Sequence, residues 1–529
     1  MPTVNTDTPT SSGEAVAKPA GIATTISRNA AISLARVAVN SLVALALPAY
    51  LTHYLPATTY GAWVLILQLG AYVSYLDFGV QTGIAKFVAE YDAMGDREGA
   101  SRHATAGFAI MSLTGALGLI LTLLLAWQVP RLFHDMPASL YQDVRISVVL
   151  IGVSLSFGLV CSVFSAIFLG LQRYFVPMAI SIANRASFTI VILVAVAFHG
   201  SLVAMATAVA FVNIITGILQ VFAWHKMASH IYVSLSLIDY RVCKQMTRYC
   251  FMLSIWSMGM LCVSGLDLTI VGHYDFNQTA YYSIATLPTS FILMVLSSVS
   301  GPMMPASSAL STQRSAFEMG AVLAKATRYS TILLLLTGLP VLVFSFPILQ
   351  LWVGPSYAVS SLTYLRILVL ANIIRNVCLP YAIMLAATGR QGAATITAIS
   401  EALVNLGSSV YLASRFGAIG VAFGTLLGSF VSVSLHFAVS MHFTRQTLAI
   451  ARRSLLRVGL FRPATIALPS LLLLPFWWTS SDLTLSPTIA ILWALSTILI
   501  AWFGTLDREE RNKLTRLTRA RFASPIRSN

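Results

Sequence analysis

The chain has 529 residues, and its composition and charge exclude a soluble protein. Lys, Arg, Asp and Glu make up only 10% of the residues, hydrophobic residues make up 57%, and the mean hydropathy is +0.79. A soluble domain carries about 25% charged residues, and a single core stops growing at about 250–300 residues. We therefore expect an all-α membrane protein with many transmembrane helices.

Several kinds of chemistry have no pattern in this sequence. The five cysteines show no CxxC or Cys/His spacing, so we expect neither a disulfide framework nor a metal or haem site, and no cofactor. The G-x-x-x-x-G-K-[ST] loop that binds nucleotide phosphates is also missing from the sequence. If the protein transports a substrate, transport must be driven by an ion gradient or by the membrane potential.

Predicted membrane spans follow a short polar start. The first 24 residues lack the basic start and apolar middle of a secretion signal, and they predict a disordered cytoplasmic tail. Apolar runs of about 20 residues, long enough to cross a bilayer, then follow one another. Fourteen spans are expected at 28–51, 61–84, 104–127, 145–169, 174–198, 201–224, 248–272, 280–303, 329–352, 362–387, 393–413, 418–443, 464–480 and 488–506.

The spans predict two six-helix lobes with a C-terminal appendage. The N-terminal lobe is expected over residues 25–226 and the C-terminal lobe over 248–443, joined by a cytoplasmic linker at 227–247. Helices 13 and 14 occupy residues 444–506. The basic tail at 507–529 is expected to lie on the inner membrane surface.

The basic residues predict the orientation, because Lys and Arg in short loops stay on the cytoplasmic side. With the N-terminus inside, the outer segments carry only Arg131, Arg145 and Arg415, whereas the cytoplasmic segments carry nearly all the others. Both termini are therefore expected in the cytoplasm. The net charge of +15 is then a topology signal, strengthened by anionic lipids, and needs no nucleic-acid partner.

An internal repeat supports the two-lobe plan. The sequence LTHYLPATTYGAW from Leu51 aligns with VGHYDFNQTAYYS from Val271, which matches His53 with His273. Repeated six-helix halves in one orientation are a known plan of secondary transporters, with the substrate site between the halves.

The sequence from Tyr50 to Gly99 resembles the first helix pair of the polysaccharide-type oligosaccharide flippases. These flippases, which carry O-antigen or exopolysaccharide repeat units, belong to the multidrug/oligosaccharidyl-lipid/polysaccharide exporter superfamily. Their motifs are a Tyr-Gly pair after the first outer loop, an acidic-Gly-basic passage that ends the second helix, and a Pro-containing exit from the eighth helix. The matching residues here are Tyr60 and Gly61, then Asp77, Gly79 and Lys86, and finally VSGPMMPASSAL from Val299 to Leu310.

This resemblance implies a V-shaped pair of lobes that works by alternating access. Such a protein moves lipid-linked oligosaccharides, usually on undecaprenyl diphosphate, from the cytoplasmic to the outer leaflet of the bacterial inner membrane. The product feeds polysaccharide biosynthesis, for example of lipopolysaccharide or exopolysaccharide. The implied partners are membrane lipids, the lipid-linked substrate, and a polysaccharide polymerase with its chain-length proteins.

Two other transport functions and one enzyme are the alternatives. A peptidoglycan-precursor flippase shares the fourteen-span count, and a multidrug or cation exporter needs a cavity with surplus acid. A membrane-embedded polysaccharide polymerase needs a large outer loop with catalytic acids or arginines. The longest outer segment here, residues 128–144, carries only Asp135, Asp143 and Arg131 as charges, so we expect no enzyme.

The charged residues inside the spans are the candidate site residues. Each costs about 2.5–3.5 kcal/mol at mid-bilayer and therefore faces a cavity or a partner. A positive surplus suits a diphosphate, because Arg binds its oxygens bidentately. The substrate-binding candidates are Arg36, Lys86, Arg185, Arg366 and Arg375, and the ion-coupling candidates are Asp77, Asp267 and Glu401.

Structural roles for these charges are the alternative interpretation. Similar depths in neighbouring helices predict the ion pairs Arg36–Asp77 and Arg375–Glu401. Asp267 would be solvated near the outer end of its helix, and Lys86 would reach the membrane interface. The family's geometry places the first, second, seventh and eighth helices at the cavity, which favours Arg36, Asp77, Lys86 and Asp267 over Arg185.

Sugar specificity has no readable code in this sequence. We expect it to be spread over polar residues of the cavity, such as Asn40, Gln68, Tyr72, Gln81 and Asn372.

Overall fold

The computed structural model describes residues 43–300, 303–311, 314–446, 448–449, 452–479, 487–512 and 515, and the regular structure in these ranges is helical. Within them, twelve helices are long and apolar enough to cross a membrane, and each overlaps an expected span, although Ala316–Val343 and Arg452–Leu473 begin well before the expected 329–352 and 464–480. The other two expected spans are the first, which begins before residue 43, and the seventh, which is an interrupted helix. The expectations for the N-terminal tail, Arg36 and Asn40 lie outside the described residues.

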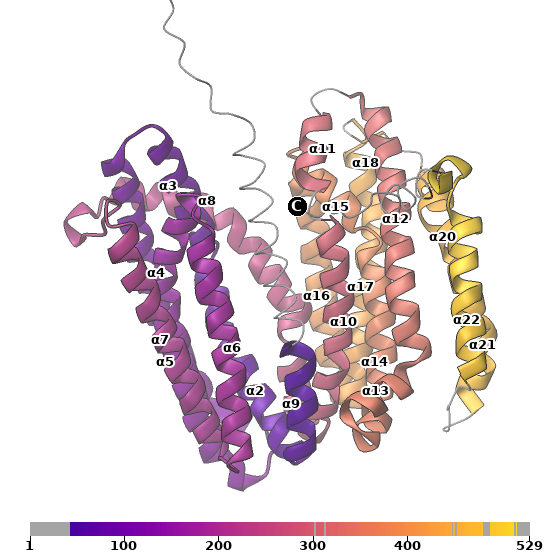
Figure 1. Cartoon of the computed structure of the whole chain (residues 1–529), viewed down its shortest axis with the longest axis horizontal. Helices are drawn as coiled ribbons and strands as arrows, with labels where there is room; N and C mark the ends of the chain where they lie inside the picture. The colour runs from indigo at the N-terminus through magenta and orange to yellow at the C-terminus, as the bar shows by residue number, and fades with distance from the viewer. Residues whose placement is uncertain are drawn as a thin grey trace, which may run out of the picture.

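The first lobe contains the helical residues 43–54 and helices α2 to α7 (Figure 1). Helix α5 lies at its centre, where it packs on α2, α3, α4 and α7. The bounds are α2 Ala57–Ser74, α3 Val80–Ala93, α4 Arg97–Leu132, α5 Ala138–Gly170, α6 Phe175–Ala197 and α7 Leu202–Met227.

One expected span of this lobe is divided by a turn. Between α2 and α3 lie a 3-10 turn, Tyr75–Asp77, and two residues with left-handed backbone, Phe78 (φ 48°) and Gly79 (φ 73°). The Asp77 carboxylate accepts a hydrogen bond from the backbone N–H of Gln81 at 3.3 Å. Because the first N–H groups of a helix have no partner within it, this bond stabilises the start of α3.

The second lobe is built from helices α9 to α18. Small residues allow α16 and α17 to approach closely, as membrane helices often do. A Cβ added to Gly424 of α17, for example, would lie 2.3 Å from Ser409 Oγ of α16. The bounds are α9 Asp267–Tyr274, α10 Thr279–Ser300, α11 Met303–Ser311, α12 Ala316–Val343, α13 Ser345–Val353, α14 Pro355–Asn376, α15 Leu379–Ala387, α16 Gln391–Phe416, α17 Ala418–Leu435, the π-helical turn His436–Ser440 and α18 Met441–Phe443.

Helix α8 (Tyr240–Met260) passes from one lobe to the other (Figure 1). It packs on α3 and α4 of the first lobe and on α16 of the second. Ser254 donates a hydrogen bond to the carbonyl of Phe78 at 3.1 Å, and Met246 belongs to the apolar core of the first lobe. A π-helical turn, Leu261–Gly265, then joins α8 to α9. The first helix of the expected C-terminal lobe therefore begins against the N-terminal lobe.

The two lobes form a V that is closed at one end. In Figure 1 they stand apart where α3, α11 and α15 lie, and they converge where α9 and α13 lie. Hydrogen bonds cross between them from Gln68 to the Gly265 carbonyl at 2.6 Å and from Trp352 to the Leu45 carbonyl at 2.7 Å. The orientation predicted from the basic residues would place the closed end outside and the open end on the cytoplasmic side.

A close backbone approach seals the closed end. A Cβ added to Gly61 of α2 would lie 3.3 Å from the backbone nitrogen of Ala280 in α10. We expect Gly61→Val to push the lobes apart at this end, because two further methyl groups have no space there. In a cysteine-free background, the disulfide yield of a Leu45→Cys/Trp352→Cys pair should fall several-fold. An unchanged yield would show that Gly61 does not control closure.

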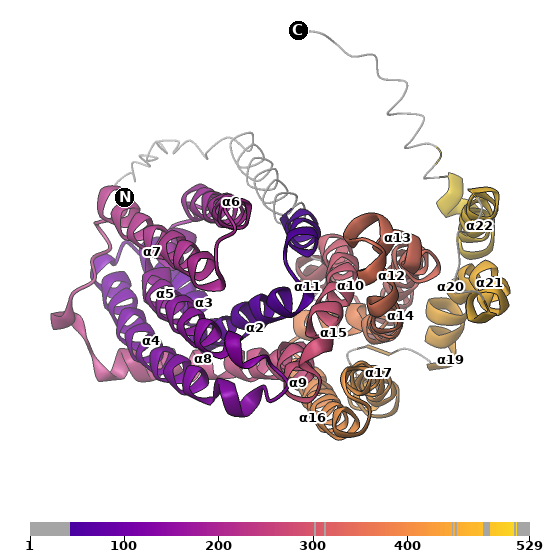
Figure 2. The same cartoon turned by 90° about the horizontal axis from the view of Figure 1, so that it is seen from below.

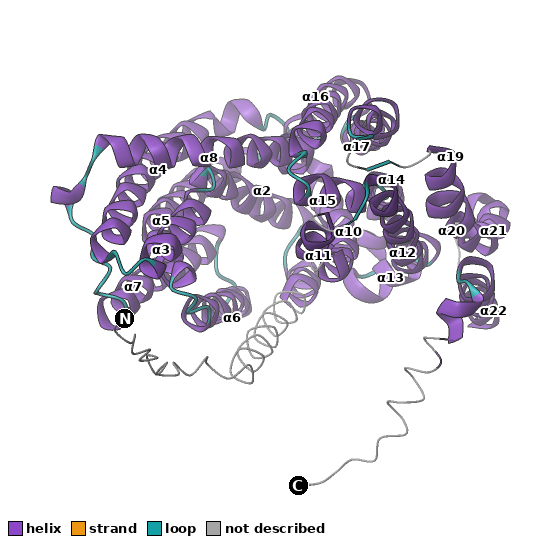
Figure 3. Ribbon diagram, turned by 90° about the horizontal axis from the view of Figure 1, so that it is seen from above, coloured by secondary structure: helices purple, strands orange, loops and turns teal. Residues whose placement is uncertain are grey.

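The C-terminal helices stand on the outside of the second lobe, remote from the first (Figures 2 and 3). Their inner surface packs on α12. The bounds are α19 Arg452–Ser454, the π-helical turn Leu455–Phe461, α20 Arg462–Ala464, the 3-10 turn Thr465–Ala467, α21 Leu468–Thr479, α22 Pro487–Leu499 and the π-helical turn Ile500–Thr505.

A buried arginine attaches the chain after these helices to α12. The Arg328 side chain is 2% exposed, and its guanidinium pairs with Asp507 at 3.0 Å and with Glu510. Arg462 of α20 contacts the other Asp507 oxygen at 2.8 Å. The hydrogen bonds from Arg328 and Arg462 hold the pKa of Asp507 below its usual range.

Loss of this cluster should release the segment after residue 506. We expect Arg328→Met to make residues 507–512 accessible to protease, because Glu510 and Asp507 lose their buried cation. The Asp507 contribution should be fully present above its unfolded pKa of about 3.9 and disappear as pH falls through the lower folded pKa. Limited proteolysis of both forms across pH checks this. Release of the wild-type segment near neutral pH would contradict it.

Candidate functional site

Three adjoining cavities line the space between and inside the lobes. The charged bay, of about 520 Å³, lies mainly in the second lobe around Asp267 and Glu401. The inter-lobe pocket, of about 440 Å³, lies beside Arg185, and the polar bay, of about 430 Å³, lies among α5, α6 and α7. Neighbouring cavities share lining residues: Ser290 joins the charged bay to the inter-lobe pocket, and Asn184 joins that pocket to the polar bay.

The charged bay contains an ion pair between two candidates. Arg375 Nε of α14 donates to Glu401 Oε1 of α16, with side chains 17% and 9% exposed, so the pair predicted from depth is present. Asp267 of α9 lines the same cavity. The bay therefore contains two carboxylates, Asp267 and Glu401, and one guanidinium, that of Arg375. The expectation of surplus positive charge in the cavity is wrong for this bay.

Asp267 is buried rather than solvated, which corrects the alternative suggested by the sequence. The residue is 7% exposed and lies in the first turn of α9. Its Oδ2 accepts a hydrogen bond from the Thr425 hydroxyl at 3.2 Å and a longer one from the Tyr282 hydroxyl at 3.5 Å. The partially positive start of a helix favours a carboxylate at this place. The π-helical turn before α9 places Asp267 at a depth that span lengths alone do not predict.

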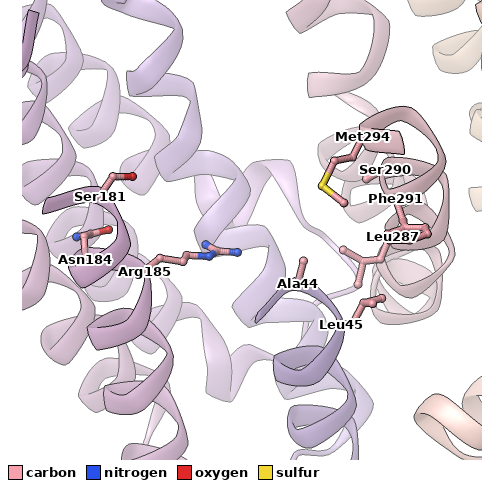
Figure 4. Close-up of a pocket in the computed structure, with 9 residues that line it drawn as sticks. All are labelled: Ala44, Leu45, Ser181, Asn184, Arg185, Leu287, Ser290, Phe291 and Met294. Atoms are coloured by element: carbon pink, nitrogen blue, oxygen red, sulfur yellow. The ribbon is translucent and has the colours of Figure 1, made fainter. Parts of the chain in front are cut away.

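Arg185 reaches from α6 into the inter-lobe pocket (Figure 4). The far wall is formed by Leu287 and Met294 of α10, and Ala44 of the first helix lies near the guanidinium. Within the described chain, no carboxylate lies within 4.0 Å of Arg185, and its buried Nε has no hydrogen-bond partner. The guanidinium carbon lies 5.3 Å from the Phe188 ring centre, a cation–π distance.

Three of the other candidates, Lys86, Arg366 and Asp77, have partners close to them in the structure. Lys86 is about half-exposed, lies 3.9 Å from Glu90 on its own helix and stacks on the rings of Phe87 and Tyr249. Arg366 Nε donates to Ser345 Oγ at 3.1 Å, Asp77 caps α3, and Arg36 lies outside the described residues. The preference of Lys86 and Asp77 over Arg185 as cavity residues is not supported by this geometry, because α6 borders the inter-lobe pocket opposite α10.

The polar bay is the part of the site that the sequence analysis did not identify. Gln68 and Asn372, named as specificity candidates, line the charged bay, and Gln81 lines the polar bay. Tyr72 instead makes a hydrogen bond across the lobes to Thr269 at 2.5 Å. The signal that was missed is a small and polar helix face: in α5, Ser, Gly, Ser and Ser occur at positions 154, 158, 162 and 165.

Comparisons with known proteins give matches of structure. No family model matches the chain, and no curated protein matches it by sequence. It is similar to a multidrug resistance MATE family transporter of the MOP superfamily in an inward-facing conformation, with a TM-score of 0.66 and 14% identity over 77% of this chain and 94% of that chain. It is also similar to the lipid II flippase MurJ in an inward closed conformation, with a TM-score of 0.63 and 12% identity over 94% and 99% of the two chains.

A third solved structure has a similar fold. An outward-facing MATE family transporter of the MOP superfamily has a TM-score of 0.58 and 14% identity, covering 80% of this chain and 95% of that chain. At such low identity the matches establish the fold alone, which is the two-lobed all-α fold of these transporters.

Proposed function

We propose that the protein is a flippase for a lipid-linked oligosaccharide in a bacterial plasma membrane. It moves the substrate, carried on undecaprenyl diphosphate, from the cytoplasmic to the outer leaflet by alternating access. The fold is shared with transporters and with a flippase of the MOP superfamily. The observation that carries the proposal is Arg185, which lies between the lobes without a carboxylate partner in the described chain.

An unpaired guanidinium in a membrane protein favours an anionic ligand. A buried cation is costly unless it is paired, and a diphosphate supplies several oxygens for bidentate hydrogen bonds. The inter-lobe pocket is lined by residues of both lobes, so rocking of the lobes would change the side of the membrane from which an anion bound there is accessible. Arg185 therefore takes the role of phosphate ligand, with Arg36, Lys86, Arg366 and Arg375 as the further proposed contacts.

The lipid part of the substrate needs apolar surface. An apolar cavity of about 560 Å³ lies among α3 and α4 of the first lobe, the connecting helix α8 and α16 of the second lobe, and it is lined by Phe78, Ile110, Phe251 and Leu403 among others. It shares Gly259 with the charged bay, so apolar and polar surfaces adjoin. This arrangement suits an amphipathic substrate.

The proposed protein partners of the flippase are a polysaccharide polymerase and its chain-length proteins.

The charged bay supplies the proposed ion coupling, with Asp267 and Glu401 as its acids and Asp77 as a further candidate. We expect Asp267→Asn to abolish the dependence of transport on an imposed proton or sodium gradient, because an amide neither releases a proton nor binds a cation as a carboxylate does. The amide oxygen still accepts from Thr425. Proteoliposomes with imposed gradients measure this, with Asp275→Asn at the other end of α9 as the control. Full gradient dependence in Asp267→Asn would exclude Asp267 from coupling.

A drug or cation exporter is the second candidate, favoured by one observation. The charged bay contains two carboxylates and one guanidinium, and an acidic bay can attract a cationic substrate. The first proposal also has a variant that differs only in the sugars of the substrate. In that variant the protein is a flippase for a lipid-linked peptidoglycan precursor.

Deletion of the gene in its own host separates these functions. The flippase proposal predicts that complete lipid-linked repeat units accumulate and surface polysaccharide disappears, and that wild-type protein but not Arg185→Ala restores it. Unchanged surface polysaccharide with new sensitivity to cationic drugs would favour the exporter. Accumulated lipid-linked cell-wall precursor would favour the peptidoglycan variant.

A further inference from the structure

The polar bay is unusual for the interior of a membrane-spanning lobe. It is an open cavity of about 430 Å³ lined mainly by α5, α6 and α7, and the side chains that line it in the described chain are uncharged. Cavities of small-molecule sites range over about 300–1,000 Å³. The polar lining residues are Ser74, Gln81, Ser154, Ser162, Ser165, Ser181, Asn184, Asn213, Thr216 and Gln220.

Helical spacing brings these groups to one surface. Asn213, Thr216 and Gln220 lie three and four residues apart on α7, so they share a face. On α5, Ser154, Gly158, Ser162 and Ser165 follow one another at intervals of four, four and three residues, so the three serines also share a face. Polar side chains within a membrane face a cavity or another helix, and here they face a cavity.

Hydrogen bonds between helices account for only part of this surface. Asn184 donates to Thr216 at 2.7 Å, and Asn213 donates to Ser154 at 3.1 Å, as polar residues between membrane helices commonly do. The buried Oε1 of Gln220 accepts no hydrogen bond from the described residues. A role in helix packing alone would leave neither an unpaired amide oxygen nor an open cavity beside it.

The bay adjoins the arginine that is proposed to hold the phosphates. Asn184 lines both the bay and the inter-lobe pocket, and it precedes Arg185 in α6. In a lipid-linked saccharide, the first sugar is bonded directly to the diphosphate. A sugar on a diphosphate at Arg185 therefore has the polar bay as an adjacent site.

We propose that the polar bay is a saccharide subsite, which binds the sugar nearest the diphosphate through the amides and hydroxyls of α5, α6 and α7. Sugar hydroxyls donate and accept hydrogen bonds, and the amide and hydroxyl side chains of the bay offer both functions. The uncharged lining favours neutral or acetamido sugars over acidic ones, because a sugar carboxylate would find no cation within the bay. This inference rests on the proposed function and adds the chemistry of the sugar.

The test compares two probes on the purified full-length protein. These are farnesyl diphosphate and the same lipid with glucose on its terminal phosphate, measured by calorimetry. In wild type, glucose should tighten binding by about tenfold, the effect of one or two hydrogen bonds to buried polar groups. In a Thr216→Val/Gln220→Met variant, the ratio of the two affinities should fall to about one, because both changes keep side-chain shape and remove hydrogen bonding.

Thr207→Val is the matched control. Thr207 lies on the same helix as Thr216, and both hydroxyls donate to the carbonyl four residues before, at 2.7 Å and 2.8 Å. Thr207 is exposed, so its substitution should keep the full glucose effect. Ser162→Ala/Ser165→Ala is the second test variant, and it removes hydroxyls from α5 with a minimal change in packing.

The outcomes separate the two proposals. A wild-type protein that binds farnesyl diphosphate through Arg185 but gains nothing from glucose would overturn the saccharide subsite and leave the flippase proposal standing. A glucose effect that survives in both bay variants would also overturn the subsite. Failure of wild type to bind either probe would overturn the flippase proposal and the subsite with it.

Discussion

Arg185→Ala is expected to weaken the binding of farnesyl diphosphate by at least about tenfold, because hydrogen bonds to charged groups contribute about 1.5–3 kcal/mol each. The pocket around Arg185 is bordered by apolar residues of α10 such as Leu287 and Met294, so water competes less for the phosphate than at a surface. Arg185→Lys should retain part of the affinity, because an ammonium keeps the charge but loses the planar pair of donors.

Arg131→Ala is the control for this substitution. Arg131 lies in the last turn of α4, where it stacks on Trp127 at 5.0 Å, and it does not line the inter-lobe pocket. Titration calorimetry of the detergent-purified variants should find wild-type affinity in Arg131→Ala. Equal affinities in wild type and Arg185→Ala would remove Arg185 from the phosphate site.

Glu401→Gln should lower the stability of the second lobe by about 3 kcal/mol, near the lower end for breaking a buried ion pair. The change leaves Arg375 in a mostly buried place with Asp267 as its remaining nearby acid. The cavity that both residues line admits some solvent, which reduces the penalty below that of a dry core. A lower melting temperature in detergent is the expected result.

The double variant Arg375→Met/Glu401→Met provides the decisive comparison. Replacing both members of a buried ion pair by apolar residues of similar size is often neutral or stabilising. The double variant should therefore melt close to the wild-type temperature while losing transport, if the pair serves function. A double variant that melts as low as Glu401→Gln would show that the pair is chiefly structural.

The all-α membrane fold and the approximate positions of twelve of the fourteen expected spans could be predicted from the sequence. The apolar length that a span needs is set by the thickness of the bilayer, so the spans could be located without knowledge of how the helices pack. The break between α2 and α3 could not, because it depends on left-handed backbone at Phe78 and Gly79 inside an apolar run. The passage of α8 between the lobes was missed for a similar reason, since it depends on which lobe its side chains contact.

The candidate site could be predicted only in part. Depth along neighbouring helices predicted the Arg375–Glu401 pair, because 1.5 Å per residue fixes the height of a side chain in a helix. Depth does not fix rotation about the helix axis or the neighbours across the lobes. Depth alone therefore could not predict that Arg185 lines the inter-lobe pocket, and the alternative in which Asp267 is solvated is wrong because Asp267 is buried.

The polar bay shows a different limit. Its uncharged residues cost less in a membrane than charges do, so a search for buried charge passes over them. The small and polar faces of α5 and α7 are readable as periodic patterns, but their meeting around a cavity depends on the packing of three helices.

Translocation in proteoliposomes tests the central proposal most directly. The purified protein is reconstituted with a lipid-linked disaccharide on a short prenyl diphosphate, and sugar exposed on the far leaflet is measured by enzymatic cleavage from outside. The flippase proposal predicts gradient-dependent exposure of the sugar with wild type and a rate near the protein-free background with Arg185→Ala. Background rates with wild type, together with gradient-driven export of a cationic dye from the same vesicles, would contradict it.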